Sequence, residues 1–196
     1  MTGFLLVLGV GLALLAVAAW RDRLSRRTAQ TTVGAPLECL EPPSLASPSE
    51  AQRAALTDFC SRALRLDARL GDPRFGTWDD PPTLELAPAE VLCCPEGVGS
   101  QRELLPSIAR ARGNQRPLLL ACPSLPDDLV AVLSAGRARQ VFWLRASAAV
   151  CGQIAEACGG EVVGRADLQS GAATAAHGEL ARVVATDDGC WLARES

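Results

Sequence analysis

An unbroken apolar segment at the N-terminus constrains this chain of 196 residues more than any other feature. Residues 3–20 (GFLLVLGVGLALLAVAAW) carry no charge. A helix of that length, at about 1.5 Å per residue, crosses most of a hydrocarbon layer about 30 Å thick. The sequence therefore predicts a transmembrane anchor over residues 1–20. A cleaved signal peptide is the alternative, because Ala16-Val17-Ala18 resembles a cleavage site, but the segment lacks a basic n-region.

Charge asymmetry around this segment predicts its orientation. Arginines occur four times in residues 21–27, whereas the other flank offers only the α-amino group. The positive-inside rule then predicts a single-pass protein of the cell membrane with its C-terminal domain in the cytoplasm. Residues 21–46 are basic at first and then polar and proline-bearing, which is typical of a juxtamembrane segment followed by a linker. Residues 47–196 are long enough for one ordinary domain.

Composition argues against several classes of function. The net charge is −3 and every basic residue is arginine, without a basic stripe, so nucleic-acid binding is not expected. Eight cysteines have irregular spacing and lie mostly in apolar segments, which favours buried, reduced side chains over a disulfide framework. Cys93-Cys94 lacks the spacing of zinc ligands. We expect neither a metal nor a cofactor.

Short apolar runs alternate with helical patterns along the domain. Ser47-Pro48-Ser49-Glu50 has the form of a capping box and predicts a helix from there to about Ala68. The alternation that follows predicts an α/β domain with a mixed sheet flanked by helices. The expected strands are residues 84–86, 91–94, 117–122 and 140–144, the expected helices are 102–112, 125–135 and 147–158, and a hairpin is expected at 181–193.

Two segments, Arg102-Glu103-Leu104-Leu105-Pro106 and Arg116-Pro117-Leu118-Leu119-Leu120-Ala121, stand in the order and spacing of a known pattern. The chain from about Leu70 to Val184 thereby resembles the apical domain of GroEL-type (group I) chaperonins. The family's glycine-rich loop before the third helix is shortened here to residues 145–149. No equatorial domain and no phosphate-binding Gly-Asp-Gly-Thr-Thr segment is present, so the resemblance implies neither nucleotide binding nor an ATP-driven folding ring.

What the resemblance implies is a groove between two helices that binds apolar polypeptide segments. Arg74 replaces an expected aromatic residue, and Ser134 and Ala135 replace larger aliphatic ones, so we expect a shallower and more polar groove than in the family. Helical spacing places Leu105 with Ile108 on one face, although the same spacing is typical of core residues. The implied groove residues are Leu70, Arg74, Phe75, Leu105, Ile108, Val130, Ser134 and Ala135.

The resemblance thus predicts a membrane-anchored, ATP-independent polypeptide-binding domain that acts like a holdase. An adaptor that binds one specific protein in a membrane complex is the alternative. An enzyme is a third and less favoured class, and we expect no enzymatic activity. His177 is the only histidine, and no acid or nucleophile is placed beside it by a motif, so it is expected to be a solvated loop residue.

Overall fold

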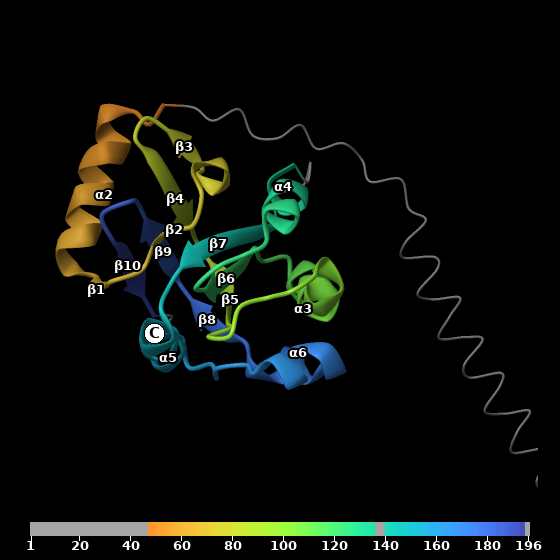
Figure 1. The fold of residues 1–196 in the computed structure, drawn as a ribbon. Coiled ribbons are helices and arrows are strands. Elements are labelled where there is room, and N and C mark those ends of the chain that lie inside the picture. Colours follow the sequence, from red (N-terminus) through yellow and green to blue (C-terminus); the bar gives the residue numbers. More distant parts are fainter. Residues whose placement is uncertain (1–46, 136–139, 195–196) are drawn as a thin grey trace, which may run out of the picture. The chain divides into compact units, whose positions relative to one another are not determined.

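A sheet of parallel strands forms the centre of the domain. The computed structural model describes residues 47–135 and 140–194 (Figure 1). The three parallel strands are adjacent in the order β7 (Val141–Arg145), β6 (Leu118–Cys122) and β5 (Ala89–Cys93). Their side chains are almost all buried, as expected for parallel strands covered by helices on both faces. Antiparallel edge strands complete the sheet, β2 (Arg69–Leu70) beside β7 and β8 (Gly178–Leu180) beside β5.

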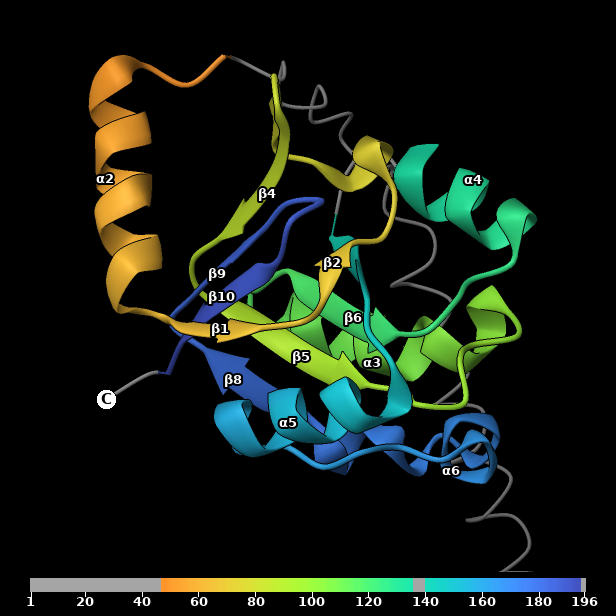
Figure 2. The same ribbon diagram turned by 60° about the vertical axis from the view of Figure 1, so that its left-hand side comes forward.

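Helices cover this sheet on both faces. The connections from β5 to β6 and from β6 to β7 contain α3 (Gln101–Gly113) and α4 (Asp127–Ala135). Crossover connections between parallel strands are right-handed, and both connections cross the sheet in the same direction, first from β5 to β6 and then from β6 to β7. The helices α3 and α4 therefore lie on the same face of the sheet. Figure 2 shows α5 (Ala148–Cys158) in front of the sheet and α3 behind it. The short helices α6 (Arg165–Ser170) and η2 (Ala172–Ala176) pack beside α3.

A second sheet is antiparallel throughout. Its order is β1-β10-β9-β4-β3, and each neighbouring pair is antiparallel. One of its faces contributes buried side chains, among them Leu84, Val183 and Leu192, to the core shared with the first sheet. The strands are β1 (Leu64–Leu66), β3 (Trp78–Asp79), β4 (Pro82–Leu86), β9 (Arg182–Ala185) and β10 (Cys190–Ala193).

The helix α2 (Glu50–Arg62) borders the opposite face of this antiparallel sheet (Figure 1). None of its residues is buried. The ring of Phe59, on this helix, lies 4.5 Å from the guanidinium carbon of Arg182. The Arg182 Nε in turn donates to Glu85 Oε1 at 3.0 Å. A capping box begins the helix, but its two residues are Ser49 and Gln52 and not the predicted Ser47 and Glu50, and the helix ends six residues before the predicted Ala68.

The predicted fold class is wrong in its sheet. The domain contains two five-stranded sheets where one mixed sheet was expected, because β1, β4, β9 and β10 pair with one another and not with the parallel strands. No helix among the described residues is both long and apolar enough to cross a bilayer. The anchor predicted over residues 1–20 and the linker over residues 21–46 lie outside the described part of the chain.

Candidate functional site

The predicted groove residues of α3 lie on the flank of that helix that faces α4. Arg112, in the last turn of α3, donates from Nε to Gln140 Oε1 at 3.0 Å, beside the start of β7. Pro106, by contrast, lies near Gly171 and α6 on the other flank. Helical rotation puts Leu105 and Ile108 on the Arg112 flank. The Leu105 side chain is 52% exposed, and Ile108 is partly buried against the core.

On α4 the exposed apolar residue is one that the resemblance did not mark. Leu129 and Leu133 are buried against the sheet, together with Val130, whereas Val132 is 50% exposed. The carboxylate of Asp127 lies close enough to Arg74 for their charges to attract each other. The Asp127 flank of α4 therefore faces the short helix η1 (Pro73–Phe75). Val132 is five positions later and therefore lies about 140° around the helix. This rotation turns Val132 toward α3.

The other predicted groove residues are not part of this surface. Leu70 in β2 and Phe75 in η1 are buried, and the Phe75 ring packs edge-on against Trp143 with centroids 6.3 Å apart. Arg74 is exposed and pairs with Asp72, Nε to Oδ1 at 2.8 Å. On α4, Val130 is buried, Ser134 is half-buried with its hydroxyl donating to the Ala131 carbonyl, and Ala135 is exposed.

We use the name α3–α4 groove for a candidate binding surface of three side chains, Leu105, Ile108 and Val132. Helix phase places Leu105 and Ile108 on the flank of α3 toward α4, and Val132 on the flank of α4 toward α3. The structure places Leu70, Phe75 and Val130 in the core. Helix phase, which requires knowing which residues of α4 are buried, was the signal that could have identified Val132.

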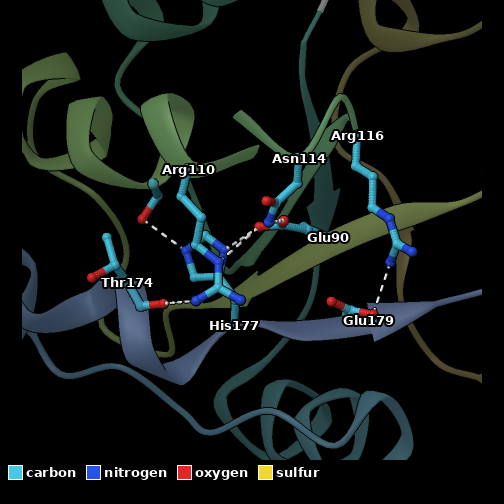
Figure 3. A network of polar contacts seen from close by, with 8 residues as sticks. Glu90, Arg110, Asn114, Arg116, Thr174, His177 and Glu179 are labelled. Carbon is cyan, nitrogen blue, oxygen red and sulfur yellow. Dashed lines mark hydrogen bonds and ion pairs between the residues drawn. The ribbon is translucent and has the colours of Figure 1, made fainter. Parts of the chain in front are cut away.

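A buried polar network holds α3 to the sheet below this groove (Figure 3). Glu90, in the middle of β5, is fully buried. His177 lies between its carboxylate and α3, with Nδ1 2.8 Å from Glu90 Oε2 and Nε2 2.9 Å from the Ser107 Oγ. Arg110 Nε also donates to Glu90 Oε2, at 3.3 Å, and Asn114 Nδ2 donates to Glu90 Oε1. Every oxygen of this carboxylate thus has a donor.

The electrostatics of the network follow from burial and hydrogen bonding. Burial lowers the pKa of His177, and this outweighs the hydrogen bond and the charge of Glu90, which act in the opposite direction. Burial also opposes the charged form of Glu90, but the hydrogen bonds from Asn114 and His177 and the charge of Arg110 hold its pKa below the usual range. The imidazole is then neutral, with Nδ1–H donating to Glu90 and Nε2 accepting from Ser107.

The expectation of a solvated His177 is wrong, because the ring is buried between α3 and β5. A serine, a histidine and a carboxylate in hydrogen-bonded series also resemble the arrangement that activates a nucleophile. The Ser107 side chain, however, lies on the buried face of α3 and has no exposed surface, so no substrate can contact its hydroxyl in this conformation. The hydrogen-bond network instead links three segments of the chain, namely α3, β5 and the residues just before β8.

This network makes stability depend on pH. The chain has one histidine, and its pKa is lower in the folded state than the value of about 6.5 expected in the unfolded chain. Below that pH the unfolded state binds more protons, so the free energy of unfolding should fall as pH decreases from about 6.5, by at most about 1.4 kcal/mol per pH unit. Urea titrations between pH 7 and pH 5 measure this slope. The variant His177→Gln should lose it, and an unchanged slope would contradict the assignment.

Other candidate chemistry is limited among the described residues. No group of three or more histidine, cysteine, aspartate or glutamate side chains in residues 47–135 and 140–194 is placed to hold a metal ion. Seven cysteines in these ranges are free thiols, and six of them are fully or almost fully buried.

Comparison with known proteins adds no relative. No protein-family model matches this chain, and no curated protein sequence matches it. The function is therefore inferred from the residues and their geometry.

Proposed function

We propose that this protein binds apolar polypeptide segments in the α3–α4 groove. The observation that carries the proposal is the exposure of Leu105 and Val132, each about half exposed, on the flanks of α3 and α4 that helix phase turns toward each other. The adjacent residues Leu104 and Leu133, by contrast, are buried in the core. Covering apolar surface yields about 25 cal/mol per Å², so two such side chains can contribute a few kcal/mol to binding.

The support beneath α3 fits this proposal. The polar network fixes α3 through Ser107 and Arg110 on its buried and α6-facing sides. The opposite flank, which bears Leu105 and Ile108, is left to contact a ligand. A rigid helix loses little conformational entropy when a segment binds to it, which favours affinity.

An adaptor for one specific protein is the second candidate. The observation in its favour is charge at the edges of the groove: Arg112 is exposed on the α3 flank and Asp128 is exposed at the start of α4. Charges of both signs beside a small apolar surface select among partners, because a partner with like charges is repelled. A holdase would instead need an apolar surface that accepts many sequences.

Site-specific crosslinking tests the proposal. A photoreactive amino acid is placed at position 105 in the full-length protein, and a second variant carries it at Gln153, an exposed residue of α5 on the opposite face. A permanently unfolded, carboxymethylated polypeptide is then added. Crosslinking at position 105 and not at position 153 supports the proposed groove, and equal or absent crosslinking overturns it.

The same two variants separate the holdase from the adaptor. In membranes and extracts from the source cells, many unrelated polypeptides crosslinked at position 105 would support a holdase. One stoichiometric protein crosslinked there, with weak capture of the carboxymethylated polypeptide, would support the adaptor.

A further inference from the structure

A pocket lies at the edge of the parallel sheet where α3 ends and where β6 and β7 begin. Its volume is about 490 Å³, which is within the range of small-molecule sites, and it is open to solvent. None of the three side chains of the α3–α4 groove lines it. The pocket is therefore a candidate site of its own, and its lining indicates which kind of ligand it suits.

The pocket has an apolar floor and a polar rim. Leu86 and Phe142 are 7% and 5% exposed, and Pro117 lines the pocket with them. The other lining residues are two arginines and two glutamines, and none of the described residues that line the pocket is acidic. Such a lining suits a ligand that has an apolar body and an anionic group.

Arg112 supplies the charge of this rim. Its Nε donates to Gln140 Oε1 at 3.0 Å, and no described residue accepts a hydrogen bond from its two terminal nitrogens. These two nitrogens can donate side by side to two oxygens of a carboxylate or phosphate. The second arginine, Arg116, is already paired, because its Nη1 donates to Glu179 Oε2 at 2.8 Å (Figure 3). The net positive charge of the rim therefore comes from Arg112.

Gln115, also in the lining, occupies a backbone position that glycine usually takes. Its N–H donates to the Arg112 carbonyl at 3.1 Å. The next N–H, that of Arg116, donates to the Ala111 carbonyl at 2.9 Å, which completes a Schellman motif. The φ angle of Gln115 is 55°, a conformation that costs stability for any residue with a side chain. A side chain kept at such a cost beside a pocket favours a functional role for it.

We propose that this pocket binds a small organic anion, whose carboxylate or phosphate group is held by Arg112 and whose apolar body packs on Leu86 and Phe142. The amide groups of Gln115 and Gln140 flank the anionic group as further donors. A purely structural role is the alternative, because an arginine in the last turn of a helix also complements the helix dipole. The site shares no side chain with the α3–α4 groove, so either proposal can fail alone.

Isothermal titration calorimetry of the full-length protein tests the inference. Phenyl phosphate and 3-phenylpropionate carry the two anionic groups on an apolar body, whereas inorganic phosphate lacks the body and 3-phenylpropanamide lacks the charge. One of the two aromatic anions should bind about tenfold or more tightly than both comparison probes. The tighter anion then identifies the preferred group. Absence of binding by both anions, or affinities equal to those of the comparison probes, would overturn the inference.

Two arginine variants locate the bound anion. Arg112→Gln should weaken binding of the tighter anion by about tenfold or more, because hydrogen bonds between charged groups are lost. The matched control Arg102→Gln removes an exposed arginine in the first turn of α3, away from the pocket, and should leave the affinity unchanged. Unchanged affinity in Arg112→Gln, or equal losses in the two variants, would show that the anion does not bind at this site.

Gln115→Gly separates binding from stability. Glycine adopts a positive φ without steric cost, so the melting temperature should rise by a few degrees. The affinity for the tighter anion should fall, since the amide donor is lost. A variant that is stabilised but binds as tightly as the wild-type protein would contradict the role of the Gln115 side chain.

Discussion

Replacement of Glu90 by alanine should lower the free energy of unfolding by about 3–5 kcal/mol, which is the usual effect of removing one partner of a buried charged network. Without the carboxylate, the buried Nδ1–H of His177 and the side-chain amide of Asn114 lose this acceptor, and Arg110 keeps only its hydrogen bond to the Thr174 carbonyl. The loss should appear as a lower midpoint in urea at an unchanged slope, because the same core still unfolds.

Glu179 supplies a matched control in the neighbouring strand. It lies directly opposite Glu90 in the β5–β8 register, but its side chain is 45% exposed and pairs with Arg116 near the surface, at 2.8 Å. Glu179→Ala should cost less than about 1 kcal/mol, because exposed ion pairs contribute little. Equal losses in Glu90→Ala and Glu179→Ala would show that the buried network does not stabilise α3.

The double variant Leu105→Glu, Val132→Glu should weaken binding of the carboxymethylated polypeptide on the order of a hundredfold or more. Each substitution removes an apolar contact worth about 1–1.5 kcal/mol, which is half the value for a fully exposed side chain, and introduces a charge that apolar segments do not solvate. Both side chains are half exposed, so the fold should tolerate the change. Fluorescence anisotropy of the labelled polypeptide measures the affinity.

The control for this experiment is Leu64→Glu, which places the same charge at an equally exposed leucine of β1 in the antiparallel sheet. Its affinity should equal that of the wild-type protein. Two results would contradict the proposed groove. One is loss of binding in Leu64→Glu, and the other is wild-type affinity in the double variant at an unchanged melting temperature. Ile108 is left unchanged because it packs against the core, where a charge would reduce stability.

Much of the local structure followed from the sequence. The expected parallel strands and helices between residues 84 and 158 are observed within a few residues of the predicted bounds, because each has a strong apolar pattern of its own. Of the pairings in the second sheet, only the hairpin expected at residues 181–193 is confirmed, as β9 and β10. The strands β1 and β3 of this sheet have only three and two residues, too short for a periodic signal, and β4 pairs with β9, about 100 residues later. Local periodicity carries no information on such pairing.

The site was predictable to a smaller extent for the same reason. Leu105 was expected and is exposed, whereas on α4 the resemblance implied Val130, Ser134 and Ala135, and the half-exposed Val132 was not named. A shift of two residues turns a helix by about 200°, so a small displacement in the alignment behind such a resemblance exchanges a surface position for a core position. Glu90 and His177 are 87 positions apart. One sequence signal existed: a glutamate inside an apolar strand must find partners.

The weak attachment of α2 has a mechanical consequence. No residue of this helix is buried, and its Phe59 rests on a surface arginine, so α2 can detach while the cores of both sheets remain packed. Tension on the chain from the N-terminal side reaches α2 before any other element of the domain. Under tension α2 should therefore detach first, while the α3–α4 groove keeps its conformation.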